Sequence, residues 1–373
     1  MESNEDRCDV LVVGAGFAGL TCARAAAALG LRTLVLERKH DPGAACRTTG
    51  ILVKEAAEEL EIPPNLVRRV SGARLYGPSL VTLDLVSPAY YFLATDTPGL
   101  LRWLSREAGA AGAVLRLGEV FCGATRRDGR FHLENVGLSA RFLVGADGVR
   151  SAVGRSLGIQ PGRSFLTGVE AELEGVRGVD PDRLHCFLDS RFAPGYIGWV
   201  VPGMGITQVG VACPADRRPR LDLFLERVRR IFDFRQARLV GHRGGLIPVG
   251  GSLRSFGATG AALVGDSAEM VSPLTGGGIH NALRLGRLTG RAVAEHLLHG
   301  GPEPHRVLED IAPRYRWKRL LRLVHGWAPP NWLFNLALAS PPFRALARAV
   351  FLHNRELLSY AAWRELLIPA DER

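Results

Sequence analysis

Three glycines and one acid near the start of the chain have the types and spacing of a dinucleotide-binding site. Gly14, Gly16 and Gly19 follow an apolar run, and Glu37 ends the next apolar run. Gly14 lets the chain turn sharply out of a strand, Gly16 lets the backbone approach a pyrophosphate, and Gly19 lets a helix pack closely on the strand. The positive end of that helix favours the anion. Glu37 is placed to accept hydrogen bonds from ribose hydroxyls.

A purely structural glycine turn is the alternative interpretation of this segment. The acid at the expected distance favours the nucleotide. It also argues against a 2′-phosphate on the ribose, because two negative charges would meet there. The predicted cofactor-binding residues of this segment are Gly14, Gly16, Phe17, Ala18, Gly19, Glu37 and Arg38.

Two later segments repeat the order of apolar strand, turn and helix. The run 141–145 leads into the Asp-Gly pair 147–148. The run 261–264 leads into the Gly-Asp pair 265–266, and the glycine cluster 276–278 then opens a long helix. Taken singly, each acid is as well explained as a helix cap and each glycine as a turn. Their common order is therefore more informative than any one of them.

Composition bounds the class of protein. A chain of 373 residues with 47% hydrophobic residues can bury a large core, and we expect two connected domains. Six cysteines without a CxxC pair indicate neither a metal site nor a disulfide framework. The net charge of +10 comes without a recognisable nucleic-acid-binding motif, which leaves an anionic membrane surface, a phosphorylated ligand or no specific partner. Residues 1–7 are polar and acidic, so a cytoplasmic chain is expected.

The three turns together resemble the flavoprotein superfamily that includes aromatic hydroxylases and geranylgeranyl reductases. Residues 145–155 are similar to its Asp-Gly motif, and residues 265–268 with the glycine cluster 276–278 are similar to its Gly-Asp motif. The resemblance implies FAD as cofactor, with Asp266 accepting from a ribityl hydroxyl and the glycine cluster offering N–H groups to the flavin ring. It adds as predicted cofactor-binding residues Asp147, Gly148, Asp266, Pro273, Gly276, Gly277, Gly278 and Ile279.

The element pattern and the resemblance predict an α/β fold. We expect a discontinuous Rossmann-like FAD-binding domain, an inserted mixed or antiparallel β-sheet substrate domain and a C-terminal helical segment. The predicted boundaries are 1–70, 97–160 and 255–300 for the first, 71–96 and 161–254 for the second, and 301–373 for the third. No second strand-GxGxxG-helix unit is present. The reductant, NAD(P)H or a ferredoxin-type carrier, is therefore expected to visit the flavin transiently.

Two departures from the hydroxylase pattern favour the reductase branch. Hydroxylases carry a His after the Gly-Asp pair and a Gly-Gln-Gly turn, whereas this chain has 267–269 Ser-Ala-Glu and the three glycines. Residues 194–202 resemble the reductases' aromatic motif Tyr-x-Trp-x-Phe-Pro, although one residue is inserted and Val201 replaces Phe. The resemblance implies that Tyr196, Trp199 and Pro202 line the substrate slot. Ordinary core aromatics are the alternative.

The predicted function is FAD-dependent reduction of C=C bonds in a prenyl, geranylgeranyl-type, or other lipidic substrate. Reduced flavin would pass hydride to one alkene carbon, and another group or water would protonate the other. Cys46, in a segment similar to the reductases' cysteine-glycine segment, is the candidate catalytic thiol, with an inert cysteine as the alternative. The other functions considered are an FAD-dependent monooxygenase or halogenase on a polycyclic or aromatic metabolite, a cyclase-like flavoprotein without net redox, and an inactive flavin-binding module.

Beyond Pro304 the chain becomes basic and aromatic. Trp317, Trp327, Trp332 and Trp363 with interleaved arginines suit a helix lying in a lipid interface, and they also suit helices that pack on the protein's own sheet. No apolar stretch here reaches the ~20 residues of a membrane span. The expected partners are a hydrophobic small-molecule or lipid substrate and, in the first interpretation, the inner face of the membrane. No nucleic acid is expected.

Overall fold

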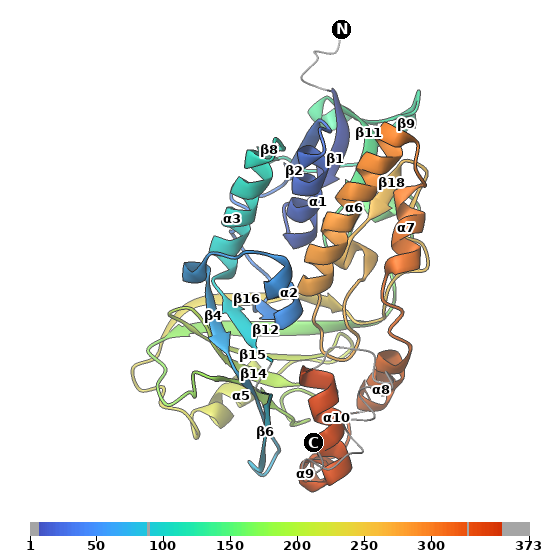
Figure 1. The fold of residues 1–373 in the computed structure, drawn as a ribbon. Coiled ribbons are helices and arrows are strands. Elements are labelled where there is room, and N and C mark those ends of the chain that lie inside the picture. The colour runs from blue at the N-terminus through green and yellow to red at the C-terminus, as the bar shows by residue number, and fades with distance from the viewer. Residues whose placement is uncertain (1–6, 88–89, 327, 353–373) are drawn as a thin grey trace, which may run out of the picture.

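The computed structural model describes residues 7–87, 90–326 and 328–352. The chain is a mixed α/β protein in which a parallel sheet with its helices lies at one end and a second, larger set of strands at the other (Figure 1). The fold class predicted from the sequence is confirmed. Trp327, Trp363 and the rest of the predicted C-terminal segment after residue 352 lie outside the described residues, as do residues 1–6.

The first sheet is Rossmann-like, with strand order β17-β18-β11-β1-β2-β8. From β18 to β8 each strand is parallel to its neighbour, and β9 and β10 add an antiparallel hairpin to β11. Its strands are β1 (Arg7–Val13), β2 (Thr33–Glu37), β8 (Val114–Leu117), β9 (Thr125–Arg127), β10 (Arg130–Leu133), β11 (Leu138–Gly145), β17 (Gly257–Ala258) and β18 (Ala261–Leu263).

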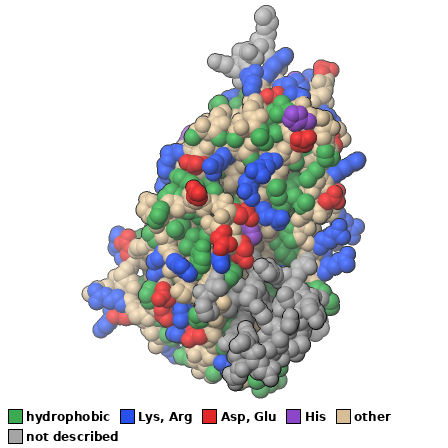
Figure 2. All heavy atoms as spheres, in the orientation of Figure 1, with side chains coloured by type: hydrophobic (Ala, Val, Ile, Leu, Met, Phe, Trp, Pro, Cys, Tyr) green, Lys and Arg blue, Asp and Glu red, His purple; other side chains and the backbone are tan. Residues whose placement is uncertain are grey.

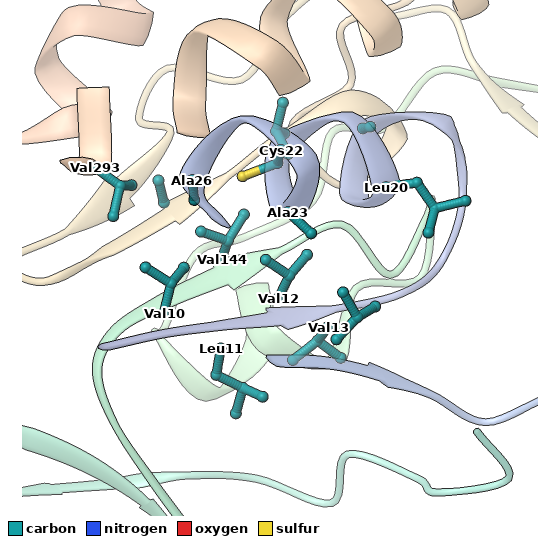
Figure 3. Close-up of a cluster of buried hydrophobic side chains, with 14 of the residues drawn as sticks. Val10, Leu11, Val12, Val13, Leu20, Cys22, Ala23, Ala26, Val144 and Val293 are labelled. Carbon is teal, nitrogen blue, oxygen red and sulfur yellow. The ribbon is translucent and has the colours of Figure 1, made fainter. Parts of the chain in front are cut away.

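The core of this half is built from fully buried aliphatic strands under two closely packed helices. α1 (Phe17–Ala28) places Cys22, Ala23 and Ala26 over β1, and α6 (Ile279–His299) lies beside it (Figure 3). A Cβ atom on Gly286 of α6 would lie 2.4 Å from the Ala18 carbonyl oxygen. Small residues therefore set the distance between these helices.

The second sheet has seven strands in the order β16-β12-β15-β14-β13-β5-β6, all antiparallel except the parallel pair β13–β5. A third sheet has the order β3-β7-β4. It combines strands from both predicted domains, whose boundaries stay a prediction. The strands of these two sheets are β3 (Ile51–Val53), β4 (Val67–Val70), β5 (Gly72–Tyr76), β6 (Thr82–Val86), β7 (Phe92–Thr95), β12 (Phe165–Glu174), β13 (Arg183–Phe187), β14 (Gly198–Pro202), β15 (Thr207–Pro214) and β16 (Arg238–Pro248).

The last helices lie beside the second sheet, and α10 packs on β6 (Figure 1). Of the helices in the described ranges, none is both long enough and apolar enough to cross a bilayer. The remaining helices are α2 (Lys54–Glu59), α3 (Thr97–Ala110), α4 (Ala152–Ser156), α5 (Leu221–Val228), α7 (Pro304–Ile311), α8 (Arg316–Gly326), α9 (Asn331–Ala339) and α10 (Pro341–Leu352).

Candidate flavin and substrate site

The three glycine-containing turns meet at one edge of the first sheet. β1, β11 and β18 are adjacent and parallel, so their carboxyl ends lie side by side. The Ala146 N–H donates to the Val13 carbonyl at 2.8 Å, and the Val264 N–H donates to the Gly145 carbonyl at 2.9 Å. The Ser267 hydroxyl donates to the same Gly145 carbonyl at 2.6 Å. Segments far apart in the sequence thus form a single candidate site, at the position where open α/β sheets bind ligands.

The three glycines of the first turn have different surroundings. Backbone atoms of the protein leave no room for a side chain at two of them, whereas the third faces open space. A Cβ on Gly14 (φ +105°) would lie 2.4 Å from the Ala146 carbonyl oxygen, and one on Gly19 would lie 1.9 Å from the Gly14 carbonyl oxygen. A Cβ on Gly16 would meet no atom within 4 Å. Gly16 is also the N-cap of α1, which has no side-chain cap. Its open surroundings and the helix N-terminus suit a pyrophosphate.

Glu37 holds this turn from the next strand. Its side chain is buried, and its Oε2 accepts from the Ala15 N–H at 2.8 Å while Oε1 accepts from the Lys39 N–H at 3.0 Å. Each carboxylate oxygen can accept a further hydrogen bond, so a ribose contact stays compatible with this geometry. Arg38 is exposed to solvent. The cofactor roles of both residues stay predictions.

Asp147 accepts hydrogen bonds at the start of the short helix α4, whose N-cap residue is Ser151. Its carboxylate accepts from the Ala152 N–H at 2.6 Å, the Val153 N–H at 3.1 Å and the Ser151 hydroxyl at 2.6 Å. Gly148 follows with φ +84°, a conformation that favours glycine. The Asp-Gly pair therefore shapes the loop that closes over the strand edge, and direct cofactor contact by Asp147 stays a prediction.

Asp266 follows β18 and lies beside the start of α6. The burial of its surroundings raises its pKa to about 6, although the side chain keeps access to solvent. Among the described residues, none donates a hydrogen bond to its carboxylate. A Cβ on Gly278 would lie 3.4 Å from its Oδ1, and α6 begins at Ile279 without a side-chain cap. Pro273 is buried in the connecting turn. An accessible acceptor and free helix N–H groups fit the hydroxyls and carbonyls of a flavin.

The predicted substrate residue Tyr196 touches the predicted flavin turn. A Cβ on Gly276 (φ +64°) would lie 2.6 Å from the Tyr196 hydroxyl oxygen, and Gly277 next to it is exposed. Burial raises the pKa of Tyr196, so the phenol stays neutral. Tyr196 belongs to a small apolar cluster on the second sheet that consists of Leu166, Tyr196, Ala212 and Val249, with Ile197, Trp199 and Ile247 half-buried against it.

The Trp199 indole lies next to a glycine on the neighbouring strand. Trp199 pairs with Gly210, and Gly210 pairs with Glu170 on the strand beyond. A Cβ on Gly210 would lie 2.4 Å from the indole ring, so only glycine leaves room for it. Pro202 is three residues farther along β14 and, by strand alternation, belongs to the opposite face. The structure brings Tyr196 and Trp199 together and leaves Pro202 apart from them.

Glu170 is a functional candidate that the sequence analysis missed. Its buried carboxylate accepts from the Trp199 indole N–H at 2.7 Å and the Thr49 hydroxyl at 2.6 Å, and Arg243 lies 3.9 Å away. Gln208 adds a contact at 3.3 Å and also donates to the Thr49 carbonyl at 2.9 Å. Burial raises the pKa of Glu170. The sequence carries no signal for it, because β12 has glutamates at 170, 172 and 174 and only the folded structure shows which of them is buried against Trp199.

Cys46 lies on the same loop as Thr49. Its thiol donates to the Gly43 carbonyl at 3.1 Å, and burial raises its pKa while Arg243 opposes the shift. The thiol therefore stays protonated near neutral pH. The loop lies over β16, where a Cβ on Gly245 would lie 3.6 Å from the Arg47 Cβ. The loop that carries Cys46 thus packs on the second sheet, the sheet that also carries Trp199.

Comparison with known proteins agrees with this geometry. The family described as FAD dependent oxidoreductase matches residues 9–77. The digeranylgeranylglycerophospholipid reductase of Methanosarcina acetivorans is 30% identical over 84% of this chain and 81% of its own length. That of Thermoplasma volcanium is 30% identical over 98% and 96%. A solved geranylgeranyl bacteriochlorophyll reductase-like protein from Thermoplasma acidophilum has a TM-score of 0.82 and 24% identity, covering 97% of this chain and 96% of its own.

The fold and the edge formed by the three turns define an FAD-dependent oxidoreductase. The open approach at Gly16, the uncapped starts of α1 and α6 and the accessible Asp266 carboxylate all suit FAD. The chain belongs to the digeranylgeranylglycerophospholipid reductase family. The resemblance to geranylgeranyl reductases that the sequence motifs predicted is thereby confirmed.

Proposed function

We propose that this protein reduces C=C bonds in the prenyl chains of a geranylgeranyl-type lipid. The observation that carries the proposal is the contact between Tyr196 and Gly276, which sets the apolar cluster of the second sheet against the predicted flavin turn. The relatives are named for reduction of a digeranylgeranylglycerophospholipid. An apolar wall next to the flavin is what hydride transfer to an isolated alkene needs, because it orients the chain and excludes water.

The chain's own residues divide the work of binding and orientation. Gly16 and the start of α1 would hold the pyrophosphate, and Asp266 would hold the ribityl chain. When bound and reduced, FAD supplies the hydride. Tyr196 and Trp199 would line the alkene slot. Cys46, a protonated thiol on the adjoining loop, is the candidate holder of the proton for the second alkene carbon.

Two parts of the proposal concern partners. The electron donor is NAD(P)H or a ferredoxin-type carrier that visits the flavin transiently, since the chain has no second glycine fingerprint. A lipid substrate would also bring the enzyme, as a cytoplasmic protein, to the inner face of the membrane as a peripheral contact.

An anaerobic half-reaction tests the proposed chemistry. The FAD-loaded protein is photoreduced, mixed with a detergent-dispersed geranylgeranyl lipid, and followed by flavin absorbance and product mass. Reoxidation with a gain of two hydrogens per double bond supports the reductase. Reoxidation only on admission of oxygen, with oxygen or halide in the product, would instead establish the monooxygenase or halogenase alternative.

Substitution of the aromatic wall sharpens this test. Trp199→Ala is expected to lower turnover at least about tenfold with flavin content unchanged, because the apolar wall beside the alkene is removed. Leu298→Ala, at an exposed site on α6, serves as the control and is expected to keep native turnover. Equal turnover in both variants would remove Trp199 from the slot.

A further inference from the structure

Helix α8 exposes large apolar side chains while it buries two of its cations. Its Trp317, Leu320 and Leu323 are 52%, 50% and 67% exposed, whereas Lys318 and Arg322 are only 6% and 9% exposed. A surface helix normally turns its apolar side inward and its cations to water. This arrangement indicates that something apolar covers the outer side of α8 when the protein works.

The inward cations are held by specific contacts, so the orientation of α8 is fixed. Arg322 donates to the Gly195 carbonyl at 2.8 Å, and its guanidinium lies 5.5 Å from the centre of the Tyr196 ring. The Lys318 ammonium lies 5.6 Å from the centre of the Tyr315 ring. Rotating the apolar side of α8 inward would break these contacts, because it would carry both cations away from Gly195, Tyr196 and Tyr315.

Helix α9 also exposes large apolar side chains. Trp332, Leu333 and Leu336 are 65%, 39% and 59% exposed. Polar side chains fix this helix to the second sheet: Asn331 donates to Asp189 at 2.8 Å, and Asn335 accepts from the Ser79 hydroxyl at 2.9 Å. Two anchored helices therefore present a Trp- and Leu-rich surface that the described part of the chain leaves exposed.

The charge of this part of the sequence indicates which kind of partner binds the exposed apolar side chains of α8 and α9. From residue 311 to residue 355 the sequence contains no Asp or Glu, and its basic residues are Arg314, Arg316, Lys318, Arg319, Arg322, Arg344, Arg348 and Arg355. Elsewhere on the face seen in Figure 2, basic and acidic side chains are interspersed. Exposed Trp and Leu in a segment whose charged residues are all basic suit the headgroup region of an anionic bilayer.

We propose that the outer sides of α8 and α9, lined by Trp317, Leu320, Leu323, Trp332, Leu333 and Leu336, dock the protein on an anionic lipid bilayer. The Trp and Leu side chains enter the headgroup and acyl boundary, and Arg314, Arg316 and Arg319 contact lipid phosphates. The inner side of α8 contacts Gly195 and Tyr196 of the candidate slot. A single helix thus separates the membrane from the substrate wall. The choice of a lipid surface rests on the proposed function, whereas its test does not require turnover.

Flotation of the FAD-loaded full chain with phosphatidylcholine vesicles, with and without phosphatidylglycerol, tests the docking surface. The native protein is expected to float with the anionic vesicles and to dissociate at high salt. Trp317→Ser/Leu323→Ser/Trp332→Ser is expected to lower the vesicle-bound fraction at least about tenfold, because three apolar side chains no longer enter the boundary. The matched control is Val114→Ser/Leu298→Ser, two residues that are 59% and 50% exposed on the first-sheet half.

Other partners for this surface would give different experimental results. If the chain's own residues cover this surface, the triple variant loses melting temperature instead of vesicle binding. If a second copy covers it, the triple variant changes the mass measured by light scattering, with vesicle binding absent throughout. Either result, or equal vesicle binding by the triple variant and the control, overturns the proposal. Vesicle binding without alkene reduction would overturn the proposed function alone, and reduction of dispersed lipid without vesicle binding would overturn the docking surface alone.

Discussion

At the scale of single residues, Gly16 separates cofactor binding from folding. Gly14 and Gly19 are confined by backbone atoms of the protein, whereas a methyl group at Gly16 would meet no protein atom. Gly16→Ala should therefore cost less than about 1 kcal/mol of unfolding free energy, as an N-cap change does, while it blocks the pyrophosphate and weakens FAD binding at least tenfold.

Isothermal titration with FAD and urea unfolding of the apoprotein check this prediction. Gly109→Ala is the matched control, since its Cβ also meets nothing within 4 Å and it lies in α3, away from the turn. We expect the control to bind FAD normally. Normal FAD affinity in Gly16→Ala would place the pyrophosphate elsewhere.

The raised pKa of Asp266 gives a pH dependence with a definite sign. Its pKa of about 6 lies above the ordinary value of 3.8, so ionisation disfavours the folded apoprotein, which loses stability as the pH rises from about 4 through 6. FAD affinity should change in the opposite direction, because the ionised carboxylate is the better acceptor for a ribityl hydroxyl. We expect affinity to fall as the pH drops through about 6 and to be nearly flat in Asp266→Asn. FAD titrations across this range measure it, and identical pH profiles would contradict the assignment.

Glu170 is predicted to act on turnover through the orientation of Trp199. Glu170→Gln keeps one acceptor oxygen but weakens the bonds from the indole and from Thr49, so kcat/KM should fall while flavin content is kept. A double-mutant cycle with Trp199→Phe, which removes the indole donor, should show a coupling of about 1–3 kcal/mol. Additive effects of the two substitutions would mean that the hydrogen bond does not position the ring.

At the scale of elements, Asp147 and the N-cap residue Ser151 hold the start of α4 after β11. Asp147→Ala removes the acceptor of two N–H groups at the start of α4, and the cost should be about 1–2 kcal/mol of unfolding free energy. Asp147→Asn should cost less because it keeps one acceptor oxygen. Urea unfolding measures both, with the exposed Asp216→Ala as a control that should be nearly neutral. A neutral Asp147→Ala would show that the loop is held by other contacts.

The sequence predicts where helices and strands lie better than it predicts which strands pair. The long helix opened by the glycines 276–278 and the apolar strands of the first sheet carry local signals, namely period and turn residues. The pairing of β7 with β3 and β4 carries none, because the short apolar run 92–95 suits either antiparallel sheet. Partner choice depends on where distant segments bring their edges.

At the scale of the whole molecule, FAD is expected to stabilise both sheets together. The chain passes between the first sheet and the others several times, as between α4 and β12 and between β16 and β17. Free FAD at about 100 times its Kd should add about 2.7 kcal/mol to a single cooperative transition. Differential scanning calorimetry with and without FAD checks this. Two transitions, of which only one moves with FAD, would show that the halves unfold independently.

The sequence motifs and the family they resemble predicted the cofactor class, because the residues that carry those motifs are local. Gly14, Gly16 and Gly19, and the pairs at 147–148 and 265–266, each specify a strand, a turn and a helix start within about a dozen residues. The substrate wall is different. Glu170, Gly210 and Trp199 lie on three strands and become one row only through the pairing of β12, β15 and β14.

The tertiary structure also decided which side chains of the basic helix α8 are exposed. The sequence of α8 allowed either packing on the sheet or contact with lipid, since composition does not say which side of a helix faces inward. Arg322 on Gly195 and Tyr196 fixes that side, and Trp317 and Leu323 are left outside. Local turns can be read from adjacent residues, whereas a helix face or a cross-strand row depends on contacts between residues that the chain brings together only when it folds.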